Sequence, residues 1–276
     1  MFYIYYVYII VSAALIPILN NFFPILRQSY SWWLTPLLLI GFILGFIILQ
    51  LLTLAVMIQF TNREKPPKNT TFFRFLLKNT LPLIVKVARV KINTKGTEKF
   101  PDDTRVMLVC NHQHDFDPAV IMSVFPDAKL GFIGKKEIYT LFPFVSKAMH
   151  RINSLLIDRE NDREAAKTII NAIKTIKEDT ASIGIFPEGY TSIECELLPF
   201  RNGCFKIATK SNVPIVVCVL NNTREIPKNI IRRKTEVDFR LVDVIYPEQY
   251  EGLNTTEIGD MIYEKMKKEL DEIRNT

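Results

Sequence analysis

The sequence predicts an α/β fold class, in which a mainly parallel sheet is flanked by helices and preceded by N-terminal transmembrane helices. Arg27 is the only charged residue among the first 60, whereas Lys, Arg, Asp and Glu are frequent after Thr61. In that later part, short apolar runs alternate with longer segments of helical periodicity, which is typical of a parallel sheet covered on both faces. The 276 residues are enough for one sizeable domain of this class plus an appendage.

Two stretches near the N-terminus predict membrane helices. Leu34–Phe60 carries no charged side chain, and at about 1.5 Å per residue it is longer than a hydrocarbon core of roughly 30 Å. Trp32 and Trp33 precede it, as interfacial aromatic residues do. Met1–Leu19 is also apolar; a signal peptide is the alternative, but the stretch lacks a basic start and an evident cleavage site. We expect residues 1–60 to form a membrane anchor with two transmembrane helices.

Residues 61–95 predict a basic amphipathic segment at the membrane surface. Up to Arg89 the cations outnumber the single acidic residue Glu64 and are Arg63, Lys65, Lys68, Arg74, Lys78, Lys86 and Arg89. By the positive-inside rule this flank faces the cytoplasm, so the chain is expected to be an integral membrane protein with a cytoplasmic domain. Thr70–Val90 mixes these cations with Phe and Leu side chains, which suits a helix lying among lipid headgroups. A pair of domain-packing helices broken at Pro82 is the alternative.

Residues 96–276 predict the cytosolic α/β domain. The expected strands are Arg105–Cys110, Leu130–Ile133, Ser154–Ile157, Ser182–Phe186, Ile215–Leu220 and Val237–Val244. The expected helices are Asp117–Phe125, Leu141–His150, Arg163–Glu178, Gly203–Ser211 and Thr256–Arg274, the last with apolar residues at helical spacing.

Charge and cysteine usage narrow the class of partner. The formal net charge of +6 suits an anionic surface or ligand. Aromatic residues do not interleave with Lys and Arg in a nucleic-acid module, so membrane lipids are the expected partner rather than nucleic acid. The four cysteines show no metal-type pairing, which favours reduced thiols in a cytosol-facing domain: Cys110, Cys195, Cys204 and Cys218.

The strongest candidate for chemistry is the pair His112 and Asp117. The apolar run that ends at Cys110 opens into a helix start at Pro118, for which Asp117 is the expected N-cap. A neutral imidazole can take a proton from a hydroxyl near pH 7, and a carboxylate on its other ring nitrogen fixes the tautomer. Simple helix capping by Asp117 and a polar loop role for His112 are the alternatives.

A metal site is a further interpretation of the same segment. Residues 112–117 are dense in donors, but the one other histidine beyond this segment, His150, falls at the end of a predicted helix. A catalytic zinc site usually has three placed protein ligands and their supporting partners. Because no second ligand cluster is visible, we expect no metal.

Two further strand ends carry candidate binding residues. Glu188 follows the strand that ends at Phe186, and its carboxylate could bind a hydroxyl of a polyol acceptor, although Pro-Glu-Gly is also an ordinary turn. Arg159 follows another strand, and with Lys135 and Lys136 it could form a cationic pocket for a phosphate. Taken singly, each of these cations could equally be a solvated surface charge.

In their order and spacing, these segments resemble the conserved blocks of the glycerolipid acyltransferases, and most closely those of 1-acylglycerol-3-phosphate acyltransferases. The likeness covers about Val106 to Leu220. Its blocks are Asn111-His112 to Asp117-Pro118, Asp158-Arg159, Phe186-Pro187-Glu188-Gly189 and Val213-Pro214-Ile215-Val216, with further similarity at Lys135-Lys136-Glu137 and Leu198 to Phe205.

The resemblance implies acyl transfer from a thioester to the 2-hydroxyl of lysophosphatidic acid, which yields phosphatidic acid for phospholipid biosynthesis. It assigns His112 as the base and Asp117 as its support, and it places Arg159, Glu188 and Gly189 against the acceptor. The acyl donor would be acyl-CoA or acyl-carrier protein, and no cofactor is expected. Direct attack by the hydroxyl requires no acyl-enzyme cysteine.

The sequence departs from the family pattern at two places. Tyr190-Thr191-Ser192 stands where Thr-Arg-Ser is common, so a cation is missing, and His114 stands where Ser is common. The first departure leaves room for another lysophospholipid or lysolipid acceptor, although the retained Arg159 favours lysophosphatidic acid. A non-catalytic membrane lipid-binding protein and a metallohydrolase are the alternatives from other classes.

Overall fold

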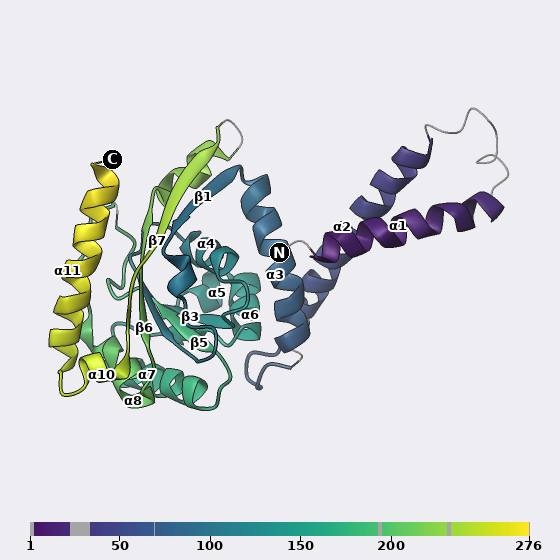
Figure 1. Ribbon diagram of the computed structural model, residues 1–276. Helices are drawn as coiled ribbons and strands as arrows, with labels where there is room; N and C mark the ends of the chain where they lie inside the picture. Colours follow the sequence, from purple (N-terminus) through teal and green to yellow (C-terminus); the bar gives the residue numbers. More distant parts are fainter. Residues whose placement is uncertain (1–2, 23–33, 69, 193–194, 231–232, 276) are drawn as a thin grey trace.

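The computed structural model describes residues 3–22, 34–68, 70–192, 195–230 and 233–275, and Figure 1 shows their arrangement. A twisted sheet forms the centre of the C-terminal part, helices cover both of its faces, and helices α1 and α2 project away from it. The predicted α/β class with a mainly parallel sheet is confirmed.

The sheet has seven strands in the order β1-β7-β6-β2-β5-β3-β4. Neighbouring strands are parallel except for β6 and β7, which are antiparallel. The carboxyl ends of β2, β3, β4, β5 and β6 therefore lie along one edge of the sheet. Strand bounds are β1 Val90–Lys95, β2 Met107–Cys110, β3 Leu130–Lys135, β4 Leu155–Ile157, β5 Ser182–Ile185, β6 Ile215–Asn221 and β7 Thr235–Ile245.

The helices connect and cover these strands. The α-helices are α1 Tyr3–Phe22, α2 Leu34–Gln59, α3 Thr70–Val87, α4 Asp117–Val124, α5 Ile138–Leu141, α6 Pro143–Arg151, α7 Asp162–Lys177, α8 Lys206–Ser211, α9 Ile226–Asn229, α10 Pro247–Tyr250 and α11 Thr255–Arg274. Short 3-10 turns lie at Thr97–Lys99, Asn202–Phe205 and Thr223–Glu225.

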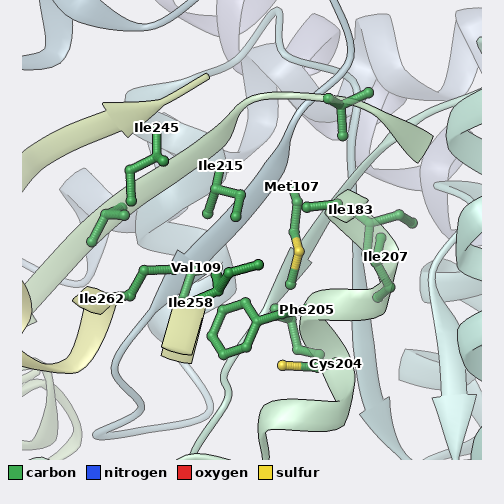
Figure 2. Packing of buried hydrophobic residues seen from close by; sticks show 14 of the residues in the cluster. Met107, Val109, Ile183, Cys204, Phe205, Ile207, Ile215, Ile245, Ile258 and Ile262 are labelled. Carbon is green, nitrogen blue, oxygen red and sulfur yellow. The ribbon is translucent and has the colours of Figure 1, made fainter. Parts of the chain in front are cut away.

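The core lies on both faces of the central strands. Met107 and Val109 of β2 face a layer that contains Phe205 and, from α11, Ile258 and Ile262 (Figure 2). The intervening β2 residues belong to the opposite cluster, together with Val120 and Ile121 of α4. Burial on both faces explains why β2 reads as an unbroken apolar run rather than an alternating one.

The N-terminal helices have the composition expected of membrane segments. Pro36–Gln59 is the one helix of the described chain that is long and apolar enough to cross a membrane, while the apolar part of α1, Tyr6–Leu15, is shorter. Trp32 and Trp33, predicted to lie at the membrane interface, fall outside the described residues. A membrane crossing by α1 stays a prediction.

Helix α6 fixes the end of α2 to the α/β domain. Lys147 Nζ donates to the carbonyl of Gln59 at 2.7 Å, and Arg151 donates to the carbonyl of Met57 at 2.9 Å. Such carbonyls at a helix C-terminus have no partner within their own helix. Arg151 also donates to Thr61 Oγ1 at 2.7 Å, so one guanidinium binds both α2 and the residues after it.

The structure corrects the prediction for residues 70–95. Helix α3 continues through Pro82, so the alternative prediction of two helices separated at this residue is wrong. Its buried face, with Phe73 and Leu76, packs against α2, while Phe72 and Phe75 are exposed. Val90–Lys95 forms the unpredicted strand β1, which pairs with β7. The sheet thus includes residues before the expected domain start at residue 96.

Other element boundaries differ for local reasons. Asp117 is the first residue of α4 rather than its N-cap, a position that Phe116 occupies. The predicted helix Leu141–His150 is two helices, α5 and α6, separated at Phe142. Proline stands at the start of α6, where its missing N–H costs nothing.

Candidate active site

The candidate site lies where β2, β5 and β6 end. Asn111 follows β2 and continues its pairing with β6: its side chain donates to the carbonyl of Leu220 at 2.9 Å and accepts from the N–H of Leu220 at 2.7 Å. These two hydrogen bonds fix the direction in which the chain leaves β2. The next residue, His112, is thereby held at the carboxyl edge of the sheet, where open α/β folds place their ligands.

His112 and Asp117 form a direct pair. Nδ1 of His112 lies 2.8 Å from Oδ2 of Asp117, and the Asp117 side chain is fully buried. The His112 side chain is 10% exposed, and its Nε2 has no hydrogen-bond partner among the described residues. A carboxylate on Nδ1 selects the tautomer that carries its proton there, which leaves the Nε2 lone pair free. The contact that the sequence predicts is confirmed.

Asp117 is held by more than the imidazole. Its Oδ2 also accepts from the backbone N–H groups of Gln113 at 2.7 Å and His114 at 2.9 Å. Its Oδ1 accepts from the Thr223 hydroxyl at 2.5 Å. These bonds fold residues 112–117 around the carboxylate, so its side chain organises the preceding loop instead of capping α4. Ionised Asp117 is compensated by donors on both oxygens despite its burial.

Glu188 supports the same loop from β5. Oε1 accepts from the backbone N–H of His112 at 2.7 Å, and Oε2 accepts from that of Leu198 at 2.8 Å. The residue is 3% exposed, and burial raises the pKa of its carboxyl to about 7, against the lowering effect of these two bonds. We expected this carboxylate to face the acceptor; instead, both of its oxygens bind backbone amides. A contact with the acceptor stays a prediction.

Phe186 connects the imidazole with a cavity. Its ring stacks on His112 with centroids 4.2 Å apart and also lines a cavity of about 620 Å³ between the sheet and α7. The apolar wall of this cavity comes from Ile133, Ile157, Ile169, Ile170, Ile173 and Ile185. His112 and Asp117 do not line the cavity themselves, so Phe186 is the wall that they share with it.

The polar part of the cavity contains Arg159, Gly189 and Arg201, and the contact of the first two with an acceptor stays a prediction. Gly189 has φ +78°, a left-handed conformation that favours glycine, and a Cβ there would lie 3.1 Å from Arg201 Nε. Lys135 and Lys136 do not line this cavity.

The predicted grouping of Lys135 and Lys136 with Arg159 is therefore wrong for the side chains. Lys136 Nζ forms an ion pair with Asp158 at 2.7 Å on an exposed surface. That pair raises the pKa of Lys136 and lowers the pKa of Asp158. Adjacent strand ends are close in space, but successive side chains leave a strand in opposite directions. Although the carboxyl ends of β3 and β4 are neighbours, the side chains of Lys135 and Lys136 therefore do not reach the cavity.

Two residues of the site were not singled out from the sequence. Thr223 lies just after β6, and Arg201 lies in the Leu198 to Phe205 segment, whose likeness to the family was noted without a role for the cation. A polar residue directly after a buried strand was a usable signal for Thr223. Arg201 is brought to Arg159 by a loop, which no local pattern indicates.

The described residues contain neither a cluster of metal-binding side chains nor a cysteine with a lowered pKa. No group of three or more His, Cys, Asp and Glu side chains is placed to hold a metal ion there. The cysteines are free thiols, and burial raises the pKa of Cys204 to about 12 and that of Cys110 well above its usual value. The four cysteines form no disulfide with one another, and their reduced state in a cytosol-facing domain stays a prediction.

Most residues of this site lie in a part of the chain that is similar to known proteins. The sequence model of the family described as Acyltransferase matches residues 91–221. A 1-acyl-sn-glycerol-3-phosphate acyltransferase of Borreliella burgdorferi is 28% identical over 198 residues, which are 70% of this chain and 78% of that protein.

Other relatives with the same printed activity match over a smaller share. The Salmonella typhimurium enzyme is 29% identical over 164 residues, 59% of this chain and 64% of that protein. The mouse alpha enzyme is 26% identical over 169 residues, 61% of this chain and 59% of that protein. The chain thus spans under two thirds of the length of these two relatives.

A solved structure shows the same fold. The crystal structure of the 1-acyl-sn-glycerophosphate (LPA) acyltransferase from Thermotoga maritima superposes with a TM-score of 0.59 at 21% identity, covering 82% of this chain and 96% of that chain. The sequence matches confirm the resemblance that the ordered blocks predict, and the solved structure shows that the fold is shared.

Proposed function

We propose that this chain, which matches the Acyltransferase family model over residues 91–221, is a 1-acylglycerol-3-phosphate O-acyltransferase. It would transfer an acyl chain from a thioester to the 2-hydroxyl of lysophosphatidic acid and form phosphatidic acid. The single observation that carries the proposal is the His112–Asp117 pair at the carboxyl edge of the sheet, inside the region that the family model matches.

In the proposed reaction, His112 is the general base. With its Nδ1 proton held by Asp117, Nε2 takes the proton of the acceptor hydroxyl as the oxygen attacks the thioester carbonyl carbon. The C–O bond forms, the C–S bond breaks, and the thiolate that leaves takes the proton back from Nε2. Asp117 stabilises the imidazolium between these steps, and its bonds to Gln113, His114 and Thr223 keep it in place.

The cavity beside Phe186 offers a place for a fatty chain. Its isoleucine wall is apolar, and each methylene moved out of water contributes about 0.8 kcal/mol. The donor, acyl-CoA or acyl-carrier protein, would deliver the thioester near Nε2 of His112.

We further propose that the domain works on the cytoplasmic surface of a membrane, anchored by α2. Between α5 and α6, a group of exposed apolar side chains, which we call the α5–α6 elbow, comprises Tyr139, Leu141, Phe142, Phe144 and Val145. Arg63 lies over the Tyr139 ring at 3.4 Å, and α6 binds the carbonyl end of α2. The elbow therefore lies where α2 would leave the lipid, which supports its insertion among headgroups.

The proposal is tested with the full chain in lipid nanodiscs. A radiolabelled acyl thioester is offered with lysophosphatidic acid, lysophosphatidylcholine, lysophosphatidylethanolamine or monoacylglycerol, and the products are separated. We expect phosphatidic acid to form fastest. Fast turnover of another acceptor with none of lysophosphatidic acid would reject the assignment and favour the alternative that Thr191 leaves open.

Replacing the base tests the chemistry. His112→Ala should lower kcat by about 10² to 10⁴-fold, the usual contribution of a general base, with little change in the melting temperature. His150→Ala is the matched control, because His150 binds the Lys65 carbonyl away from the site. Full activity of His112→Ala would support a non-catalytic lipid-binding protein with a contaminating activity.

A further inference from the structure

Two guanidinium groups lie side by side at the polar part of the cavity. A Cβ on Gly189 would lie 3.1 Å from Arg201 Nε and 3.9 Å from Arg159 Nε. The Arg159 and Arg201 guanidinium carbons are 5.3 Å and 5.4 Å from the Tyr190 ring centroid. Burial and, after it, the charge of Arg201 lower the pKa of Arg159. Two like charges held this close repel each other unless an anion joins them.

Among the described residues no carboxylate lies within ion-pair distance of either arginine, although the charge of Glu137 raises the pKa of Arg159 against the effects of burial and of Arg201. Asp162 lines the same cavity but forms no ion pair with either arginine. Nη1 of Arg159 is fully buried and lacks a hydrogen-bond partner there. Arg201 donates only a long bond of 3.3 Å to the Tyr190 hydroxyl among the described contacts. A buried, charged donor without a partner is costly, so the unpaired group points to a ligand.

We propose that Arg201 joins Arg159 in binding the phosphate monoester of the acceptor, an inference that rests on the proposed function. A phosphate monoester carries close to two negative charges and several acceptor oxygens, and guanidinium groups match that geometry with paired bonds. Arg201 would thus supply the cation that is missing at Tyr190-Thr191-Ser192. The Tyr190 ring lies within 5.4 Å of both guanidinium carbons and so limits their positions.

The position of the pair favours the acceptor phosphate over a phosphate of the donor. In lysophosphatidic acid, one carbon and one ester oxygen separate the carbon of the reacting hydroxyl from phosphorus, so the phosphate must bind beside the base. Gly189 directly follows Glu188, whose carboxylate holds the His112 backbone, and Phe186 touches both His112 and the cavity. The phosphates of a coenzyme A thioester lie at the far end of its pantetheine arm.

Steady-state kinetics of the full chain in phosphatidylcholine nanodiscs test this assignment. We expect Arg201→Gln to raise the KM for lysophosphatidic acid about 10- to 100-fold, the range for a lost hydrogen bond to a charged group. The KM for the acyl thioester should change less than twofold. Inorganic phosphate should inhibit the wild type competitively against lysophosphatidic acid, and the variant more weakly. Arg201→Lys should recover part of the loss.

Controls separate the possible failures. Arg163→Gln removes an exposed cation of α7 outside the cavity and should leave both KM values unchanged. If Arg201→Gln raised only the KM for the acyl thioester, Arg159 and Arg201 would be assigned to the acyl donor and the proposal would be overturned. Equal loss with both substrates and a lower melting temperature would assign Arg201 a structural role. Failure of the wild type to acylate lysophosphatidic acid would overturn the proposed function instead.

Discussion

Asp117 shows how one buried carboxylate can organise a site. Its oxygens accept from the His112 ring, from two backbone N–H groups and from the Thr223 hydroxyl. The backbone bonds fold the loop, and the Thr223 bond fixes the rotation of the carboxyl group relative to the imidazole. In the proposed reaction, Thr223 is therefore a positioning residue, which would act on the acceptor only through Asp117.

Replacing Thr223 should affect turnover more than binding. Thr223→Val removes the hydroxyl and leaves Oδ1 of Asp117 without this donor, which costs about 1–3 kcal/mol for a buried group. We expect kcat to fall by about tenfold while both KM values stay within twofold, measured in the acyltransfer assay. Thr223→Ser retains the donor and should remain near wild type. Equal kcat for the valine and serine variants would contradict this role.

Glu188 should make the stability of the protein depend on pH in an unusual direction for a carboxylate. Its pKa is raised by burial from 4.5 to about 7 in the folded state, so between these values the folded state binds more protons than the unfolded state. Stability from this group is greatest below pH about 4.5 and is lost as the pH rises to about 7, by on the order of 3 kcal/mol.

Thermal unfolding in detergent checks this. The melting temperature of the wild type, relative to that of Glu188→Gln, should fall as the pH rises between about 4.5 and 7 and then remain level, because glutamine does not titrate. A difference that grows in favour of the wild type over the same interval would show that the ionised carboxylate is the stabilised form.

At the scale of elements, the contacts between α6 and α2 determine how the α/β domain lies relative to the apolar helix α2. Lys147 and Arg151 bind the last carbonyls of α2, and the α5–α6 elbow follows directly from the same two short helices. In Figure 1, α11 lies on the side of the sheet away from α2. The elbow and α11 should therefore differ in their exposure to lipid.

Site-specific fluorescence can measure this difference. In a Cys195→Ser background, an NBD label at Phe142→Cys should be quenched by nitroxide-labelled lipids in vesicles, because this side chain is 58% exposed and apolar in an elbow beside α2. The same label at Lys268→Cys on exposed α11 should not be quenched. Equal quenching at the two positions would contradict insertion of the elbow.

Across the whole molecule, the sequence predicts contacts between residues close together in the chain better than contacts between distant residues. His112 and Asp117 are five residues apart, so a strand end and a helix start suffice to bring them together. By contrast, Arg201 and Arg159 are far apart in the sequence but both lie near Gly189, and the Glu188 carboxylate accepts from the N–H of Leu198 in the following loop. The sequence does not predict strand β1, because Val-Lys-Ile-Asn-Thr-Lys is too polar for a buried run and closely follows a basic helical segment.

The packing of α2 makes a prediction for the whole chain, because α2 is part of the folded body and not only a tether. Leu54 and Ile58 of α2 share a buried cluster with Phe73, Leu76 and Ile152. Burial of one such side chain contributes about 1.5–3 kcal/mol, and each kcal/mol changes the melting temperature of a domain this size by about 2–4 °C. A chain shortened to residues 60–276 should therefore melt on the order of 10 °C lower.

Activity on a water-soluble, short-chain lysophosphatidic acid separates stability from membrane delivery. Near its lowered melting temperature, the shortened chain should lose turnover even with this acceptor. If unfolding causes the loss, turnover should return on cooling. In the full chain, Leu54→Ala with Ile58→Ala should reproduce much of the lower melting temperature while α2 stays in place. A shortened chain as stable as the full one would mean that α2 only anchors the domain and that its contacts with α3 contribute nothing to the fold.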